Sequence, residues 1–400
     1  MVSLSPSPLS LSLSLPLSLS LSLSLPHSHP APLPPVRQAE RALLDKNEGH
    51  EYLPIDGDAD FRAASLRLLL GEGSVEVAEG RVAALQSLSG TGSLRVGAAF
   101  LARFLPAGTP VYVSDPTWGN HRNIFGDAGM EWRNYRYFDR GTIGLDWSGL
   151  REDLGAAPEG SVVVLHGCAH NPTGIDPTRE QWEWILELCR TRRLLPFFDV
   201  AYQGFATGDL EADAWAPRRF AAAGQEFLCA QSYAKNLGLY GERVGCLSLV
   251  VPPGDGAKET ATRAASQLKR VARAIYSNPP AHGARVARDV ISDPAMFEEW
   301  KTELAGMAGR ILAVRRALRT ALEARAARGT DRVSGRDWSF VTDQIGMFSY
   351  TGMTPAQCDH LTKEWHVYLT RDGRLSLAGL NLASCERLAD GICDALETCE

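Results

Sequence analysis

The sequence lacks the features that would place it in several large classes of protein. Its 400 residues hold no uninterrupted apolar run of about 20 residues, the length that a transmembrane helix needs, so we expect no membrane span. No block rich in lysine and arginine occurs, and the net charge is -6, so nucleic acid is not an expected partner. Because neither HExxH nor CxxC spacing occurs among its histidines and cysteines, we expect no metal site.

The eight cysteines are scattered along the chain rather than paired at short spacings. This pattern is typical of the reduced thiols of an intracellular enzyme. With 44% hydrophobic and 22% charged residues, the composition is that of a globular protein. The length exceeds what one hydrophobic core usually supports, so we expect a large domain and a smaller companion. The cysteines are Cys168, Cys189, Cys229, Cys246, Cys358, Cys385, Cys393 and Cys399.

The N-terminal tract, residues 1–35, contains no charged side chain, and the first in the chain is Arg37. Residues 1–25 are leucine and serine in near alternation, broken by prolines. A secretory signal needs a basic start and a continuous apolar stretch, and an organelle transit peptide is serine-rich and acid-poor but also arginine-rich. We therefore expect a low-complexity tail that is disordered or serves in targeting. The expected location is soluble and intracellular: the cytoplasm, or a plastid or mitochondrion if the tract is a transit peptide.

Four apolar runs, at residues 110–114, 162–166, 194–198 and 226–230, predict short buried strands. Helical segments such as residues 181–189 lie between them, an alternation that indicates a mostly parallel sheet between layers of helices. Ligands of such sheets bind beyond the carboxyl ends of the strands. The polar or aromatic residues that follow the four runs are Trp118, Asn171, Asp199 and Lys235.

The C-terminal part of the chain changes to a largely helical pattern from about residue 284. We therefore predict a large domain over residues 36–306 and a small α/β domain over residues 307–400. The expected elements of the C-terminal part are helices at residues 296–304 and 307–327, short strands around 347–350 and 365–369, a strand-like segment at 372–380 and a closing helix from Cys385.

Lys235 stands in a polar loop punctuated by glycines, with Ser232 before it and Arg243 after it. A solvated surface lysine is the ordinary alternative, because lysine is almost never buried. A lysine that forms a Schiff base beside a bound phosphate would need neighbours such as Ser232 and Arg243. Serine and arginine side chains are typical phosphate ligands.

A second candidate anion site is the run Ser89, Gly90, Thr91 and Gly92, which we expect just ahead of a helix at residues 96–104. Free backbone N–H groups, two hydroxyls and the positive end of a helix dipole would meet there. The alternative is an ordinary helix N-cap, which favours the same residue types.

Pyridoxal phosphate (PLP) is one cofactor that would use all of these residue types. It would form an imine with Lys235, and its ring nitrogen needs a buried carboxylate, which Asp199 can supply. Its ring face needs an aromatic partner such as Trp118, and its phenolic oxygen needs donors such as Tyr202 and Asn171. Each has an ordinary alternative: a helix N-cap for Asp199, core packing for Trp118 and a turn at Asn171.

Two arginines are candidates for binding the carboxylates of a substrate. Arg374 lies in the strand-like segment of the small domain, and Arg273 precedes the run Ala-Ile-Tyr-Ser-Asn-Pro-Pro. Both could equally be ordinary exposed arginines.

Several of these motifs together resemble aspartate aminotransferase, a class I aminotransferase of fold type I. The resemblance runs from about Val36 to the C-terminus, and the residues of the motifs are closest to those of the plant and mitochondrial type. The motifs are Ser-Gly-Thr-Gly-Ser-Leu-Arg, Pro-Thr-Trp-Gly-Asn-His, Cys-Ala-His-Asn-Pro-Thr-Gly, Phe-Phe-Asp-Val-Ala-Tyr-Gln-Gly-Phe, Gln-Ser-Tyr-Ala-Lys-Asn with Gly-Leu-Tyr-Gly-Glu-Arg-Val-Gly, Tyr-Ser-Asn-Pro-Pro and Asp-Gly-Arg.

The resemblance implies a mostly parallel seven-stranded sheet between helices, with a smaller α/β C-terminal domain. It implies a PLP-dependent transaminase that moves the amino group between L-aspartate and 2-oxoglutarate, giving oxaloacetate and L-glutamate by a ping-pong mechanism. Lys235, Asp199 and Tyr202 would be the catalytic residues. The cofactor would be held by Ser89, Gly90, Thr91, Trp118, His121, Asn171, Asp199, Tyr202, Ser232, Lys235 and Arg243. The substrate would be bound by Arg374, Arg273, Asn171 and Trp118.

The resemblance also implies a homodimer with shared active sites. Tyr52 would reach the cofactor phosphate of the partner subunit, and Arg273 would bind the distal carboxylate of the partner's substrate. In this family a Leu-Gly-Val-Gly-Ala-Tyr-Arg segment that covers the substrate lies upstream of the position of Val36, where this chain has its leucine/serine/proline tract. Two alternatives therefore stay open: an aminotransferase of broader or aromatic specificity, and a cofactor-binding homologue that is catalytically impaired.

Overall fold

The computed structural model describes residues 32–328 and 331–399. Residues 1–31, which make up most of the expected low-complexity tail, lie outside the described residues. The first helix, α1 (Pro34–Lys46), begins two residues before the expected start at Val36, because proline is well suited to the first turn of a helix. Within the described ranges, we find no helix that combines the length and the apolar character needed to cross a membrane.

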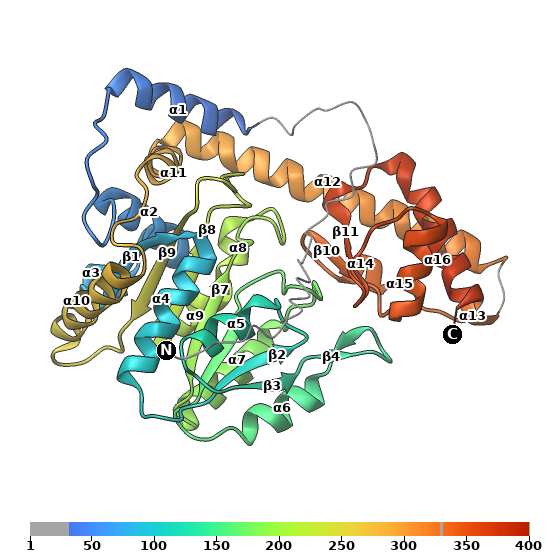
Figure 1. The fold of residues 1–400 in the computed structure, drawn as a ribbon, viewed down its shortest axis with the longest axis horizontal. Coiled ribbons are helices and arrows are strands. Elements are labelled where there is room, and N and C mark those ends of the chain that lie inside the picture. Colours follow the sequence, from blue (N-terminus) through green and yellow to red (C-terminus); the bar gives the residue numbers. More distant parts are fainter. Residues whose placement is uncertain (1–31, 329–330, 400) are drawn as a thin grey trace, which may run out of the picture.

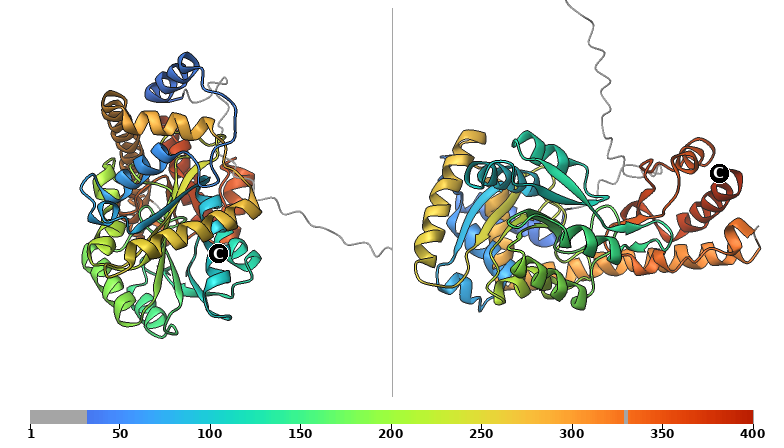
Figure 2. Two further views of the ribbon diagram at one scale, coloured as in Figure 1. Left: turned by 90° about the vertical axis from the view of Figure 1, so that its left-hand side faces the viewer. Right: turned by 90° about the horizontal axis from the view of Figure 1, so that it is seen from below.

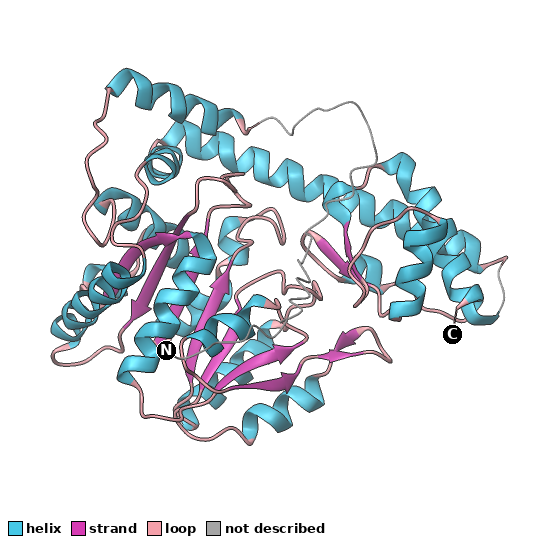
Figure 3. Cartoon of the chain, viewed as in Figure 1, coloured by secondary structure: helices cyan, strands magenta, loops and turns pink. Residues whose placement is uncertain are grey.

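A seven-stranded sheet forms the centre of the larger body of the molecule (Figures 1 and 3). Its strands are β1 (Val82–Leu88), β2 (Val111–Asp115), β3 (Trp132–Arg136), β6 (Val162–His166), β7 (Leu195–Val200), β8 (Phe227–Ser232) and β9 (Val244–Val250). They lie in the order β1-β9-β8-β7-β6-β2-β3. The pairs from β8 to β3 are parallel, and β9 is antiparallel to both of its neighbours. The sheet is therefore mostly parallel, as the sequence predicted.

Each face of the sheet is covered by its own hydrophobic cluster, because successive strand residues point to opposite faces. Val164 and Phe197 belong to a cluster with α4 (Ser89–Phe104), α5 (Asn120–Asp127) and α10 (Ala257–Ile275). Their chain neighbours Leu165 and Phe198 belong to a second cluster, with α2 (Ala59–Leu70), α7 (Arg179–Thr191) and α9 (Trp215–Ala222). Burial on both faces explains why these strands are continuous apolar runs.

The helix α12 (Pro294–Ala326) extends from the sheet to the C-terminal body of the molecule (Figures 1 and 2). This body contains the elements from α13 (Asp331–Ser334) to α16 (Leu382–Thr398). The sequence predicted two helices here, at residues 296–304 and 307–327, and this prediction is wrong. A glycine such as Gly306 costs a helix only about 1 kcal/mol. The buried residues Leu304 and Ile311 lie on either side of it and continue one apolar face, which outweighs that cost.

The C-terminal body contains a two-stranded antiparallel sheet of β10 (Phe348–Tyr350) and β11 (Arg374–Ser376). The strand expected around residues 365–369 is wrong. His366 has a φ of 54°, a left-handed conformation that a strand cannot contain. The division into domains at residues 306 and 307 stays a prediction, and α12 runs across it. The helices of this body are α13 (Asp331–Ser334), α14 (Phe340–Asp343), α15 (Pro355–Glu364), η1 (Leu377–Gly379) and α16 (Leu382–Thr398).

Short elements complete the description of the larger body. They are α3 (Val75–Ala78), α6 (Trp147–Gly155), α8 (Leu210–Asp213), α11 (His282–Ser292), β4 (Phe138–Asp139) and β5 (Gly144–Leu145).

Candidate active site

A cavity of about 340 Å³ lies at the carboxyl ends of β7 and β8 and extends to the C-terminal body. The polar and aromatic residues that follow the four predicted strands all line it, as does Arg374 from β11. The sequence-predicted residues that the structure brings together there are Ser89, Gly90, Thr91, Trp118, Asn171, Asp199, Tyr202, Ser232, Lys235, Arg243 and Arg374.

Lys235 projects into the cavity from the loop that follows β8. Its side chain is partly buried, and its Nζ atom lies 5.1 Å from the centre of the Tyr202 ring. Burial lowers the pKa of Lys235, and the charge of Arg243 acts in the same direction while Asp199 opposes it. The neutral amine, which is the nucleophilic form, is therefore easier to reach than in an exposed lysine.

Asp199 stands at the end of β7 and is 6% exposed. Its Oδ2 atom lies 3.1 Å from Nε2 of His121, whose Nδ1 atom lies 2.8 Å from the Thr117 hydroxyl. Burial acts to raise the pKa of Asp199, but the hydrogen bond and charge of His121, with charges farther off, outweigh it, and the net shift is downward. The cavity therefore keeps a buried carboxylate in its ionised form.

The Ser-Gly-Thr-Gly run lies inside α4, as its first turn, and not ahead of the helix as the sequence suggested. Ser89 has a φ of 62°, and its hydroxyl lies 2.8 Å from that of Ser232. A Cβ atom on Gly90 would lie 3.2 Å from Cβ of Ser232, so glycine allows α4 and β8 to approach closely. Two hydroxyls and the free N–H groups of a helix start therefore converge on one side of the cavity. We name Ser89, Gly90, Thr91 and Ser232 the anion cradle.

Arg374 from the C-terminal body lines the cavity together with Asn171, Phe348 and Tyr202. Nη1 of Arg374 donates to Oδ1 of Asn171 at 3.1 Å, and its guanidinium lies 4.6 Å from the centre of the Phe348 ring. Burial raises the pKa of Tyr202, with the Asp199 charge adding to the effect. Tyr202 therefore keeps its proton and can donate a hydrogen bond into the cavity.

Sequence reasoning missed Phe348, Met347 and Tyr240, which also line the cavity. The stretch around residue 348 was predicted only as a strand. The one available signal was the alternation of side chains between the two faces of that strand. Phe348 and Tyr350 lie on the same face of β10, and Tyr350 pairs with the candidate site residue Arg374.

Behind the cavity, His121, His166 and Asp199 each offer a possible metal ligand, and these atoms lie within 4.8 Å of one another. Both ring nitrogens of His121 already have hydrogen-bond partners. We therefore interpret His121 as a support for the Asp199 carboxylate and assign no metal to the cluster.

The family model for aminotransferase class I and II matches residues 20–392 of this chain. The chain belongs to this aminotransferase family. Curated relatives include aspartate aminotransferase P2, mitochondrial, of Lupinus angustifolius, which is 54% identical over 90% of this chain and 77% of its own length. The chloroplastic aspartate aminotransferase of Arabidopsis thaliana has the same identity and coverage. The cytoplasmic enzyme of Oryza sativa subsp. japonica is 52% identical over 89% of this chain and 85% of its own length.

Solved structures of other aminotransferases have the same fold. An aspartate aminotransferase from Trypanosoma cruzi is 48% identical to this chain, with a TM-score of 0.84 over 93% of this chain and 89% of that one. An aromatic-amino-acid aminotransferase from Burkholderia pseudomallei, covalently bound to pyridoxal phosphate, is 43% identical. Its TM-score is 0.86 over 92% of this chain and 88% of that one.

In this aminotransferase three predicted site residues do not line the cavity: His121 lies behind it against Asp199, and Tyr52 and Arg273 lie away from it. Tyr52 is 82% exposed, in the loop between α1 and α2. Arg273 is exposed near the end of α10, and its Nη1 atom donates to the Ser277 hydroxyl at 2.8 Å. Neither side chain lines the cavity of its own chain.

Proposed function

We propose that this chain is an aspartate aminotransferase that uses pyridoxal phosphate to move the amino group between L-aspartate and 2-oxoglutarate, yielding oxaloacetate and L-glutamate. The observation that carries the proposal is the cavity itself, in which a partly buried lysine faces a buried carboxylate and an arginine. Membership of the aminotransferase family and relatives named aspartate aminotransferase support it.

The residues of the cavity fit pyridoxal phosphate in charge and in their hydrogen-bonding groups. The anion cradle and Arg243 would hold the phosphate, Lys235 would bind the aldehyde carbon and Trp118 would cover the ring. Asp199, kept ionised by His121, would hold the proton on the ring nitrogen. Tyr202 and Asn171 would donate hydrogen bonds to the phenolic oxygen.

When bound, the cofactor supplies an electron sink for the electron pair that the substrate Cα atom retains on losing its proton. Arg374 binds the α-carboxylate, and the hydrogen bond to Asn171 fixes the orientation of its guanidinium. Once the substrate amine has displaced Lys235 from the aldehyde carbon, the freed lysine amine, with its lowered pKa, would take the proton from Cα and pass it to that former aldehyde carbon. Asp199 keeps the ring nitrogen protonated throughout, and Tyr202 keeps its hydrogen bond as a protonated phenol.

The proposed active unit is a homodimer, because two residues expected to bind cofactor and substrate cannot do so within their own chain. Exposed Tyr52 would contact the phosphate in the partner's cavity, and exposed Arg273 would contact the distal carboxylate of the partner's substrate. A C2 dimer supplies both contacts twice. The amino-acid and oxo-acid substrates are small molecules, in agreement with the size of the cavity.

A second candidate function is an aminotransferase of aromatic or broader specificity, because the solved relatives include aromatic-amino-acid aminotransferases. The ratio of kcat/KM for L-aspartate to that for L-phenylalanine separates the two functions. We expect aspartate to be preferred, since Arg273 offers a charge to its second carboxylate.

The first test is a visible absorption spectrum of the full chain with pyridoxal phosphate, recorded before and after addition of L-aspartate. We expect a band of the lysine-bound cofactor that is replaced by the spectrum of pyridoxamine phosphate, and no lysine-bound band in Lys235→Ala. If the band forms but aspartate does not change it, the chain binds the cofactor and is catalytically impaired. If no band forms, the proposed function is wrong.

The proposed location is the cytoplasm, or a plastid or mitochondrion if residues 1–35 act as a transit peptide. Relatives named for all three compartments match the chain. Fusion of residues 1–35 to a fluorescent protein distinguishes these locations by import or its absence.

A further inference from the structure

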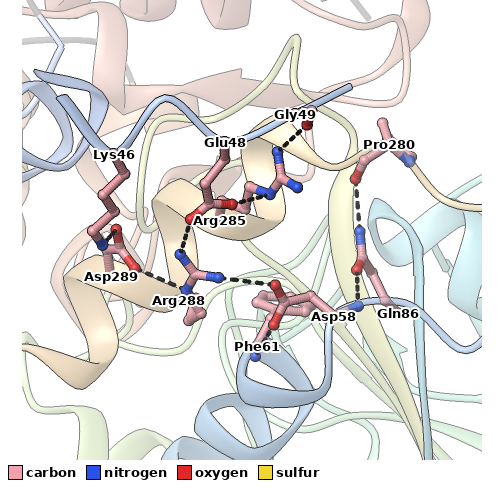
Figure 4. Close-up of polar contacts among 10 residues, drawn as sticks. All are labelled: Lys46, Glu48, Gly49, Asp58, Phe61, Gln86, Pro280, Arg285, Arg288 and Asp289. Atoms are coloured by element: carbon pink, nitrogen blue, oxygen red, sulfur yellow. Dashed lines mark hydrogen bonds and ion pairs between the residues drawn. The ribbon is translucent and has the colours of Figure 1, made fainter. Parts of the chain in front are cut away.

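The loop between α1 and α2, residues 47–58, carries the exposed Tyr52. The loop is attached at both ends to α11 (Figure 4). Glu48 lies near its beginning and Asp58 is its last residue. Arg288 of α11 contacts both: Nη2 lies 3.3 Å from Oε1 of Glu48, and Nη1 lies 3.0 Å from Oδ2 of Asp58. The Arg288 side chain is 15% exposed. One guanidinium therefore bridges the two ends of the loop.

Neighbouring charges hold Arg288 and the start of the loop in place. Nε of Arg288 lies 2.8 Å from Asp289, which also binds Lys46 at 2.8 Å. Arg285 lies 2.6 Å from Glu48 and donates to the Gly49 carbonyl oxygen at 3.1 Å. Burial opposes ionisation of Asp289, but hydrogen bonds from Arg288 and Lys46 lower its pKa overall. The group balances three cations against three carboxylates, and three of these six charges, those of Arg288, Glu48 and Asp289, each have more than one ion-pair partner within it.

The end of the loop is fixed equally well. Asp58 caps α2 by accepting from the Phe61 N–H at 2.8 Å, and its own N–H donates to Oε1 of Gln86 at 2.9 Å. Gln86 in turn donates to the Pro280 carbonyl oxygen at 2.8 Å. The loop is therefore attached to β1 and to the segment before α11.

The middle of the loop is attached to the segment that also contacts Arg273. Nδ2 of Asn278 donates to the Leu53 carbonyl oxygen at 2.7 Å, next to Tyr52. Oδ1 of Asn278 lies 3.5 Å from Nη1 of Arg273. The two exposed residues proposed to serve the partner subunit are thus connected through one asparagine.

Fixing an irregular loop in one conformation opposes the backbone entropy of each of its residues. Arginine is suited to this task, because its planar guanidinium presents five donors and can bind several carboxylates at once. A single Tyr52 hydroxyl contributes more to binding if it is held at the right place before the ligand arrives, because less ordering entropy is then lost on binding.

We propose that Arg288 is a positioning residue, which bridges Glu48 and Asp58 so that Tyr52 is held ready for the cofactor phosphate of the partner subunit. This inference rests on the proposed function, because it takes that phosphate as the ligand of Tyr52. Arg288 itself touches neither cofactor nor substrate.

The test is a double-mutant cycle on the full chain, with the dissociation constant of pyridoxal phosphate as the readout. Tyr52→Phe is expected to weaken binding by about tenfold, the usual effect of losing a hydrogen bond to a charged group. Arg288→Met is expected to weaken it by about fivefold in the native background, and by less than twofold when Tyr52→Phe is already present. The unfolding midpoint of each variant is measured in parallel.

Arg325→Met is the matched control. Arg325 also pairs with two carboxylates, those of Glu386 and Asp390, and is 22% exposed, but it lies in the C-terminal half of α12. We expect it to leave the dissociation constant unchanged. Equal losses from Arg288→Met in both backgrounds would indicate a general structural role and overturn the inference, as would an unchanged constant in either single variant. Failure of the unchanged chain to bind pyridoxal phosphate would instead contradict the proposed function.

Discussion

Arg374 and Arg273 differ in their surroundings, although both are proposed to bind a carboxylate. Arg374 lies in the cavity against Asn171 and Phe348, whereas Arg273 is exposed and held by Ser277. We expect the two arginines to have separable effects on substrate preference.

The prediction is that Arg273→Leu lowers kcat/KM for L-aspartate by about 10- to 150-fold, the usual worth of a hydrogen bond to a charged group. Turnover of L-phenylalanine, which has no second carboxylate, should change less than threefold. Arg374→Leu should lower both by a similar factor, because every amino acid has an α-carboxylate. Steady-state kinetics with the two substrates measure this, and equal losses in Arg273→Leu would refute its assignment.

His166 is a buried histidine whose behaviour with pH can be predicted. Among the described residues neither of its ring nitrogens has a hydrogen-bond partner. Burial, with the nearby His121, lowers its pKa to about 3, whereas in an unfolded chain the value is about 6.5. Between these values the unfolded chain binds a proton that the folded chain does not, so stability falls as the pH falls through this window.

We therefore expect the free energy of unfolding to decrease between pH 6 and pH 4 more steeply in the native chain than in His166→Gln. The difference between the slopes of the two stability curves should reach about 1.4 kcal/mol per pH unit, which is the value for the uptake of one proton on unfolding. Denaturant unfolding at a series of pH values measures it. Parallel curves for the two proteins would contradict the pKa assigned to His166.

At the scale of elements, β9 brings the anion cradle together. Gly245 of β9 pairs with Ser87 on one side and Ser232 on the other. A Cβ atom there would lie 2.4 Å from the Gln231 carbonyl oxygen and 2.6 Å from the Ser89 carbonyl carbon. These are backbone atoms, which cannot move away without shifting a strand or the start of α4.

Gly245→Ala should therefore destabilise the protein by about 1–3 kcal/mol, as overpacking does, and weaken binding of pyridoxal phosphate by displacing Ser89. Gly241→Ala is the control, because a Cβ atom there has no neighbour within 4 Å among the described residues. Thermal unfolding and cofactor titration check both effects. Similar results for the two variants would show that the close approach at Gly245 does not matter.

Four strands, β2, β6, β7 and β8, could be predicted because burial on both faces makes them continuous apolar runs. The same rule located most of the cavity, since ligands bind beyond the carboxyl ends of parallel strands. Strand β9 was missed because it starts directly after a loop rich in glycine. Its antiparallel pairing with β1 and β8 depends on those strands, so the residues of β9 alone do not predict it. The contact between Asn171 and Arg374, 203 residues apart, depends on how the C-terminal body packs against the sheet, which no local pattern encodes.

At the scale of the whole molecule, the proposed dimer makes each active site depend on two chains. Lys235 serves the cavity of its own chain, whereas Tyr52 and Arg273 lie outside it. The sequence predicted Lys235 from the apolar run before it, whereas the roles of Tyr52 and Arg273 in the partner's site came only from resemblance to a family. The spacing of residues along the sequence does not show which subunit's active site a side chain serves. The packing of distant segments decides which side chains lie at the surface and can reach a partner.

A mixture of two variants that are each impaired toward L-aspartate should therefore regain activity toward it. Lys235→Ala and Arg273→Leu, unfolded and refolded together in equal amounts, form hybrids in half of the dimers, and each hybrid has one intact site. We expect about a quarter of the native activity toward L-aspartate. The same variants refolded separately and then assayed together are the control. No gain over that control would contradict the shared site.

The pairing of β1 with β9 also has a consequence for synthesis of the chain. Val82 pairs with Val250, which the ribosome adds roughly 170 residues later, or about 8–34 s at the usual rates of elongation. During this interval the apolar strand β1 has no partner along its edge, a state that exposes it to wrong associations. Ser89 follows β1 directly, and β9 lies between β1 and the strand β8 that carries Ser232. We therefore expect a nascent chain to bind the phosphate of its cofactor only after about residue 250 has left the ribosome.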